Sequence, residues 1–383
     1  MPELENYEGR EQGFVKHAII EKYLETFAIK ISSKWDNIVY IDAFAGPWEN
    51  VAEDLSDTSF CIALKQLHSG ITIAKERFTR DVLVQAYLVE KNKKAFRKLS
   101  EFSREQKTSG FEVTCLQGSF EDRLPELQSQ INQSSPKASF LFALIDPKGW
   151  TGLSMKNIAP LFKNRSTEVL VNVMTSFIHR FADVEHCSDS YERYFGRSDV
   201  RDSIKEADSG ERDDAVVREY CRSLRQFCEF KYVSSAIILE PNKTDIKYFM
   251  VYGTNSAMGI KVFKEAEAHA ASLQDQIKKE KALKGQRLLF DDDTPPAFSA
   301  SLREKYRCIM KKRIRELFNN RNSIPYVDVF CKAMAIPLVT EDDLQKTLDR
   351  DPDLHLKLDG QRRKKPSIDI EKYDDRVVRN AHT

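Results

Sequence analysis

The sequence predicts an α/β fold: a doubly wound, Rossmann-like sheet with a helical insertion, followed by a small C-terminal domain. Short apolar or β-branched runs alternate with helical stretches from about residue 10 to residue 270. Several runs are apolar almost throughout, which is typical of strands covered by helices on both faces. A stretch rich in Asp and Pro, residues 285–299, then separates this region from a basic tail.

Length and composition limit the class of protein. A chain of 383 residues suits two domains, and 41% hydrophobic with 31% charged residues excludes both a disordered chain and a membrane protein. The first eleven residues lack the layout of a secretory signal. The seven cysteines are scattered without a CxxC pair, which argues against a disulfide framework and against a zinc site. We expect a cytoplasmic protein with no membrane partner and no metal.

Seven runs are the candidate strands of the sheet. Strands that alternate with helices favour right-handed crossovers and a parallel sheet. Only eight residues separate the last two, and Pro241-Asn242-Lys243 between them is a turn signal, so we expect a terminal antiparallel hairpin at the sheet edge. The candidate strands are Asn37–Phe44, Asp81–Val89, Glu112–Leu116, Ser139–Ile145, Glu168–Met174, Tyr232–Leu239 and Tyr248–Tyr252.

The remaining segments predict an insertion and a second domain. Residues 177–230 are polar and helical, and we interpret them as a helical insertion in a domain that spans 1–284. After the linker at 285–299, residues 300–383 have the order of a winged-helix domain: three helices, then a short strand pair with a charged tip. The helices are Ser301–Asn319, Val327–Met334 and Glu341–Asp349, and the strand pair begins at His355–Leu358.

Charge is unevenly distributed between these two parts. The formal net charge of the chain is +1, yet residues 301–383 hold 19 Lys and Arg against 14 Asp and Glu. Within the tail, the run Gln361–Lys365 contains Arg362, Arg363, Lys364 and Lys365, which we predict to contact nucleic-acid phosphates. A solvated charged surface is the alternative for this run.

Acidic residues end the first two predicted strands. The turn after the first strand contains Asp42, Phe44 and Gly46; a carboxylate followed by small residues lets backbone N–H groups approach a nucleoside cofactor. The second strand ends in Glu90, where a carboxylate receives two ribose hydroxyls. An ordinary β-to-α turn at Gly46 and a solvated acid at Glu90 remain the alternatives.

Polar residues also follow the third strand. In this loop Ser119, Glu121 or Asp122 could receive the exocyclic amine of an adenine. Ser119 with Asp122 three residues later also resembles a capping box, so a helix N-cap is an equally good interpretation.

The fourth strand ends in Asp146-Pro147, followed by Trp150. A carboxylate and a carbonyl side by side at the sheet edge can hold a planar amine, since Pro has no N–H to donate. Trp150 is suited to stack on a flat base. An Asx-Pro turn is the alternative for this segment.

These features together resemble a class I S-adenosylmethionine methyltransferase, and more specifically the three-Cys-motif partner (TcmP) family. The resemblance covers residues 16–260. It implies S-adenosylmethionine as cofactor and a partner protein that carries three cysteines. The matching segments are Lys16-His17-Ala18-Ile19-Ile20 with Tyr23-Leu24, Tyr40–Pro47, Ser59–Leu64, Ile145–Gly149 and Thr254–Gly259.

The resemblance also implies roles for single residues. Lys16 and His17 would join the cofactor site, although a surface lysine and a half-buried histidine are the plainer interpretation. Asp42, Gly46 and Glu90 would hold the methionine and ribose parts of the cofactor. Ser119 and Glu121 would hold its adenine, and Asp146 would be catalytic.

The leading hypothesis is therefore a methyltransferase acting on a nucleic-acid base, with adenine N6 in RNA or DNA as one acceptor. A second hypothesis is a non-catalytic nucleic-acid-binding protein on a degenerate methyltransferase fold, motivated by Trp48 and Lys148 in place of the usual residues. A dehydrogenase is the third, and the glycine-poor turn at 42–47 and the terminal hairpin argue against it.

Overall fold

The computed structural model describes most of the chain: residues 4–46, 55–105, 110–134, 139–150, 152–240, 243, 245–284, 299–359 and 363–380. The predicted linker falls outside these ranges except for Ser299, as do Pro47, Trp48 and Arg362. Within these ranges, no helix combines the length and apolar character that crossing a membrane requires.

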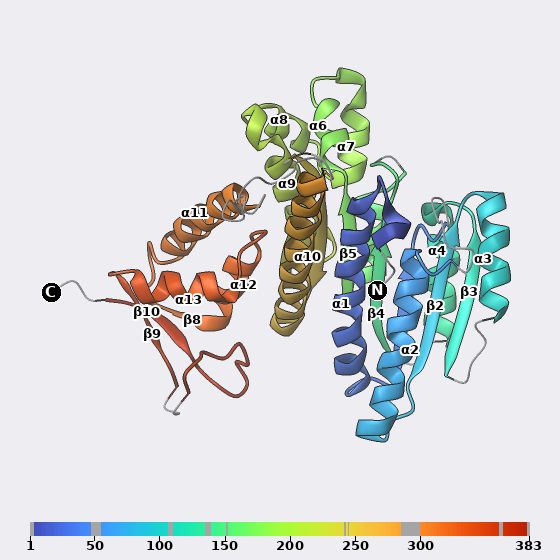
Figure 1. The fold of residues 1–383 in the computed structure, drawn as a ribbon, viewed down its shortest axis with the longest axis horizontal. Coiled ribbons are helices and arrows are strands. Elements are labelled where there is room, and N and C mark those ends of the chain that lie inside the picture. Colours follow the sequence, from blue (N-terminus) through green and yellow to red (C-terminus); the bar gives the residue numbers. More distant parts are fainter. Residues whose placement is uncertain are drawn as a thin grey trace.

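A mostly parallel sheet of seven strands forms the centre of the larger part (Figure 1). Its strand order is β3-β2-β1-β4-β5-β7-β6, and β7 runs antiparallel to both of its neighbours. The predicted α/β class and terminal hairpin are confirmed, and the sheet is Rossmann-like. The strands are β1 (Asn37–Asp42), β2 (Leu83–Glu90), β3 (Phe111–Gln117), β4 (Ser139–Ile145), β5 (Ser166–Val173), β6 (Tyr232–Leu239) and β7 (Ile246–Thr254).

Helices cover both faces of this sheet. The first helix, α1, packs between α2 and α10 on one face, while α4, α5 and α9 pack against one another on the other. Phe60 of α2 meets Phe102 of α3 with ring centroids 5.2 Å apart, so α3 joins the first layer. The bounds are η1 (Leu4–Tyr7), α1 (Glu11–Ser32), α2 (Ser59–Phe78), α3 (Lys93–Glu105), α4 (Phe120–Ser134), α5 (Met155–Phe162) and α10 (Ala257–Lys284).

A group of short helices lies between β5 and β6, where the sequence predicts an insertion. Figure 1 shows α6, α7 and α8 together at one end of the sheet, with α9 leading back toward it. These elements are α6 (Thr175–Arg180), η2 (Glu185–Cys187), α7 (Ser188–Phe195), α8 (Val200–Lys205), η3 (Ser209–Glu211) and α9 (Arg212–Phe227).

The C-terminal part contains three helices and a small antiparallel sheet of order β8-β10-β9. The three predicted helices are present, and β8 adds a strand that the sequence did not predict, since only three residues form it. The elements are α11 (Ala300–Leu317), β8 (Ser323–Pro325), α12 (Tyr326–Met334), α13 (Glu341–Arg350), β9 (Leu354–Lys357) and β10 (Arg376–Arg379).

A buried ion pair joins this C-terminal part to the larger one. Lys264 and Glu267 of α10 pair with side chains only 6% and 3% exposed. The Lys264 Nζ donates to the carbonyl of Ile336 at 2.9 Å, and Glu267 accepts from the backbone N–H of Leu338 at 2.8 Å. Because buried charges need partners, these contacts fix the segment after α12 against α10.

A buried polar network accounts for Thr254 and Gly259, the two ends of the segment Thr254–Gly259. Glu168 of β5 accepts hydrogen bonds from Tyr23 and, at 2.8 Å, from Thr254. A Cβ on Gly259 would lie 2.5 Å from the Tyr252 hydroxyl and 2.6 Å from the Glu168 carboxylate, so only glycine lets α10 begin this close. The network thus connects α1, β5 and β7 through buried hydrogen bonds.

Candidate active site at the carboxyl edge of the sheet

Three acidic residues reach the same edge of the sheet. In the parallel ladder, Asp42 of β1 is level with Leu88 of β2 and with Leu144 of β4. Glu90 and Asp146 each follow those partners by two residues, so all three acids lie at the carboxyl ends of adjacent strands. Ligands of open α/β sheets bind at this edge.

Asp42 is buried among polar groups. One carboxylate oxygen accepts from the backbone N–H of Phe44 at 3.1 Å, and the other accepts from the hydroxyls of Tyr40 and Ser59, each at 3.3 Å. Burial, with a further contribution from the charge of Asp146, raises the pKa of Asp42 to about 7. The carboxyl group therefore changes charge near neutral pH, and a cation placed beside it would favour its ionised form.

The turn after β1 is hydrogen-bonded to the two strands on either side of β1. The N–H of Ala43 donates to Leu144 of β4 and that of Ala45 donates to Val89 of β2, both at 2.9 Å. Phe44 and Gly46 are half-buried in this turn. Their predicted roles toward a cofactor stay predictions.

Glu90 is 3% exposed at the end of β2. Its carboxylate accepts from the backbone N–H of Asn92, and its carbonyl accepts from the N–H of Gly118 at 3.0 Å. Glu90 is thus not the solvated strand-end acid of the alternative interpretation. Its predicted role on a ribose stays a prediction.

The loop after β3 is built as a helix cap. The N–H of Asp122 donates to the Ser119 hydroxyl at 3.2 Å, and that hydroxyl donates to the Asp122 carboxylate at 2.5 Å. Glu121 accepts from the backbone N–H of Ser154 with one oxygen and from Arg193 of α7 with the other. The N-cap interpretation of Ser119 is therefore confirmed, and its adenine role remains a prediction.

Asp146 forms the centre of a small polar group. Lys16 of α1 donates to one carboxylate oxygen at 2.5 Å, and the Asn172 amide of β5 donates to the other at 2.7 Å. The remaining Asn172 oxygen is buried and has no hydrogen-bond partner among the described residues. A buried acceptor without a donor is costly unless a ligand or water supplies one, so this atom marks a candidate ligand position.

Trp150 and Pro147 are both buried. The Trp150 ring lies with its centroid 4.9 Å from that of Tyr191 and 5.9 Å from that of Tyr194, both of α7. The ring is 5% exposed and is covered by the helical insertion. Trp150 thus packs under the insertion, and its predicted stacking on a base stays a prediction.

His17 supports the N-terminal segment that brings Lys16 to Asp146. Its Nδ1 lies 2.7 Å from the Tyr7 hydroxyl, which donates to the Asp57 carbonyl at 3.3 Å. Burial, with the charges of Lys16 and Arg10, holds the pKa of His17 well below its ordinary value. His17 is therefore a neutral, buried histidine that fixes the start of α1.

The described residues of the basic run Gln361–Lys365 lie in two different environments. Arg363 donates two hydrogen bonds to the buried carboxylate of Asp375, at 2.8 and 2.6 Å, and its guanidinium lies 3.8 Å from the Tyr373 ring centroid. Arg363 thereby holds the loop between β9 and β10 in place, and its predicted phosphate contact stays a prediction. Lys364 and Lys365 are exposed, and their phosphate role stays a prediction.

Two residues of this site were missed at the sequence level. Asn172 interrupts the apolar run Val-Leu-Val-Asn-Val of β5, and that polar residue inside a buried strand was the available signal. Arg193 reaches Glu121 from 72 residues away, a contact that no local pattern indicates.

Together, the fold and site define an α/β protein with a Rossmann-like sheet and an acidic carboxyl edge. No protein-family model and no curated protein matches the chain. Among solved structures it is similar to loganic acid methyltransferase with SAH, with 8% identity and a TM-score of 0.30 over 74% of this chain and 91% of that one. A similarity this weak assigns neither fold nor function.

Proposed function

We propose that this protein is an S-adenosylmethionine-dependent methyltransferase that acts on a nucleic-acid base. The observation that carries the proposal is the set of three acids at one sheet edge, Asp42, Glu90 and Asp146, on adjacent strands of the order β3-β2-β1-β4-β5-β7-β6. This edge is where a nucleoside cofactor binds in Rossmann-like sheets.

The residues at this edge fit the chemistry of the cofactor. The buried Glu90 carboxylate is a suitable acceptor for two ribose hydroxyls, and Asp42 is a suitable partner for the ammonium of the methionine part. The raised pKa of Asp42 supports this assignment, because a cationic ligand would stabilise the ionised form of this buried carboxyl group. When bound, S-adenosylmethionine supplies an electrophilic methyl group on a sulfonium.

Asp146 and Asn172 would position the acceptor. A planar amine offers two N–H donors, and the unpartnered Asn172 oxygen together with an Asp146 oxygen offers two adjacent acceptors. Held in this way, the nitrogen lone pair can be aligned, and alignment contributes up to roughly 7–11 kcal/mol in favourable reactions. Asp146 can also accept the proton that the amine loses.

The tail supports a nucleic-acid substrate. Its element order, helix, strand, helix, helix and two strands, is that of a winged-helix domain, which we propose for residues 300–383. Lys364 and Lys365 lie in the loop between its last two strands, where they would contact phosphates.

The test is methyl transfer from tritiated S-adenosylmethionine to RNA and to DNA. Asp146→Ala should lower the rate by about 10²–10⁴-fold, because positioning and proton transfer are both lost, while cofactor binding changes little. Asp81→Ala is the matched control, since that carboxylate is 88% exposed before β2. Equal rates in Asp146→Ala and the wild type would place the chemistry elsewhere.

A second candidate is a nucleic-acid-binding protein without catalysis, which would act with a three-Cys-motif partner. The observation that favours it is the engagement of Asp146 by Lys16 and of both Glu121 oxygens by protein groups. This candidate predicts nucleic-acid binding that is unaffected by S-adenosylmethionine and yields no methylated base. A methylated nucleoside detected by mass spectrometry would exclude it.

A further inference from the structure

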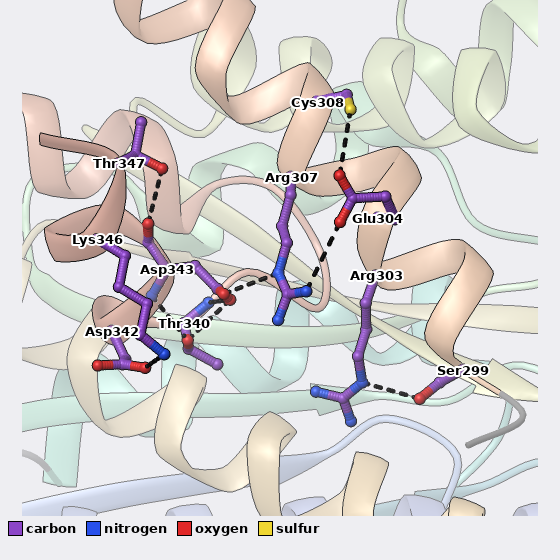
Figure 2. A network of polar contacts seen from close by, with 10 residues as sticks. All are labelled: Ser299, Arg303, Glu304, Arg307, Cys308, Thr340, Asp342, Asp343, Lys346 and Thr347. Carbon is purple, nitrogen blue, oxygen red and sulfur yellow. Dashed lines mark hydrogen bonds and ion pairs between the residues drawn. The ribbon is translucent and has the colours of Figure 1, made fainter. Parts of the chain in front are cut away.

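A polar groove of about 890 Å³ lies between α11 and α13 of the tail, well away from the carboxyl edge of the large sheet. Figure 2 shows part of its wall, with Arg307 of α11 directed toward Asp343 of α13. Six basic side chains line it, and they come from both helices. They are Arg307, Lys311, Lys312, Arg315, Lys346 and Arg350.

Four acidic residues also line the groove, and the two whose side chains are buried pair with arginines; the four are Glu304, Glu316, Asp343 and Asp351. Asp343, 8% exposed, accepts from Arg307 at 2.8 Å, and Asp351, 5% exposed, accepts from Arg315 at 3.1 Å. These pairs leave the arginine side chains 40% and 64% exposed, so each guanidinium still presents donors to the groove. The acids therefore hold the arginines in place more than they cancel the charge at the surface.

Two lysines of the lining make no ion pair with a described residue, although the acid Glu316 follows Lys312 by four residues on the same helix. Lys311 and Lys312 are exposed on α11, and neither has a hydrogen bond or an ion pair with any residue that the structure describes. Lys311 follows Arg307 by four residues and precedes Arg315 by four, so the three lie one above the other on one helix face. The result is a row of cations along the groove.

The character of the lining identifies the kind of ligand. None of the twelve described residues that line the groove is apolar, whereas protein interfaces have an apolar core. Guanidinium and ammonium groups in a row match phosphate oxygens, which accept from Arg in a bidentate way and from Lys as point charges. The lining therefore favours a phosphate backbone over an acidic peptide.

The N-terminal end of α13 is poorly suited to bind these phosphates. Thr340 and Asp343 form a capping box, in which the N–H of Asp343 donates to the Thr340 hydroxyl and the N–H of Thr340 donates to the Asp343 carboxylate. The first turn also carries Glu341 and Asp342, which would repel an anion. A helix with such an end is poorly suited to enter a nucleic-acid groove, so the contact shifts toward α11.

We propose that the groove between α11 and α13 binds the sugar–phosphate backbone of a nucleic-acid strand, with Lys311 and Lys312 as principal contacts. This inference rests on the nucleic-acid substrate of the proposed function. It assigns phosphate binding to the groove, a surface separate from Lys364 and Lys365 on the loop after β9. Contacts of this kind position the strand and do not read its sequence.

The test measures binding of a fluorescein-labelled, mixed-sequence RNA strand to the full-length protein by fluorescence anisotropy across about 50–200 mM salt. Replacing Lys311→Glu together with Lys312→Glu should weaken binding about tenfold or more and reduce the log–log salt slope by about 1.4, or about 0.7 per contact. Lys311→Arg with Lys312→Arg keeps the charge and should retain the affinity. The matched control is Arg97→Glu with Lys98→Glu on the exposed face of α3, far from the groove.

Two results would overturn the proposal. One is wild-type affinity in the Lys311→Glu and Lys312→Glu protein, or an equal loss in the α3 control. The other is displacement of the RNA by polyglutamate at equal charge, which would make the groove a site for an acidic protein. Titration of the wild type and of the Lys311→Glu and Lys312→Glu variant with S-adenosylmethionine distinguishes this proposal from the proposed function. RNA binding through the groove without cofactor binding would support the groove as the RNA site and refute the methyltransferase activity.

Discussion

The carboxyl edge of the large sheet and the groove of the tail are both charged, but they are built in opposite ways. At the edge, Asp42 and Glu90 are buried and receive hydrogen bonds from backbone N–H groups of the turns that follow their strands. In the groove, Lys311 and Lys312 are exposed on one helix. The edge has buried acceptors in fixed positions, and the groove has exposed cations in a row.

This difference teaches what each region can recognise. A buried acceptor discriminates between ligands because a mismatch leaves it without a partner in a medium of low dielectric constant. Exposed cations attract any polyanion, and each contributes a modest, salt-dependent amount. The edge is therefore suited to one small molecule, and the groove to a long strand of any sequence.

The largest expected effect concerns two ion pairs of α10, the helix that packs against both the large sheet and the tail, because one pair is buried and the other is partly exposed. Lys264→Met should lower the free energy of unfolding by roughly 3–5 kcal/mol, because it leaves the buried Glu267 without its partner. Lys261→Met, on the same helix, breaks a 2.9 Å pair with Glu341 that is 35% and 28% exposed, and should cost less than about 1 kcal/mol. Urea unfolding of both variants measures this, and equal losses would contradict the distinction between buried and exposed pairs.

A smaller effect concerns pH at the carboxyl edge. Since the pKa of Asp42 is raised to about 7, the folded protein binds a proton there that the unfolded chain has released. The contribution of Asp42 to stability is therefore present at low pH and declines as the pH rises from about 4 to about 7. Binding of a cationic cofactor beside Asp42 requires loss of this proton, so its affinity should rise about tenfold between pH 6 and pH 8.

Asp42→Asn tests the source of this pH dependence. The variant cannot titrate at this position, so its affinity for S-adenosylmethionine should be weaker but nearly constant over the same pH range. Isothermal titration calorimetry at three pH values measures both proteins. A slope as steep in Asp42→Asn as in the wild type would assign the titration to another group.

The elements of the sheet were largely predictable from the sequence. The bounds of β4 and β6 agree with the predicted ranges, because Ser139–Ile145 and Tyr232–Leu239 are buried runs with clear breaks at both ends. The three-residue strand β8 was not predicted, because its pairing with β10 depends on residues more than fifty positions away.

The site was predictable only where it depends on strand ends. Asp42, Glu90 and Asp146 could be placed at one edge because parallel strands end together. The contact of Lys16 with Asp146 joins residues 130 positions apart, and the burial of Trp150 depends on where the insertion folds. Such contacts arise from packing between elements, which local patterns do not encode.

The central claim is that the carboxyl edge binds S-adenosylmethionine, and calorimetric titration of the wild type and of Glu90→Ala tests it most directly. The wild type should bind one cofactor per chain, and Glu90→Ala should bind at least about tenfold more weakly, since hydrogen bonds to a charged acceptor contribute about 1.5–3 kcal/mol. Glu101→Ala, exposed on α3, is the control and should bind like the wild type. No detectable binding by the wild type, or equal binding by Glu90→Ala, would contradict the claim.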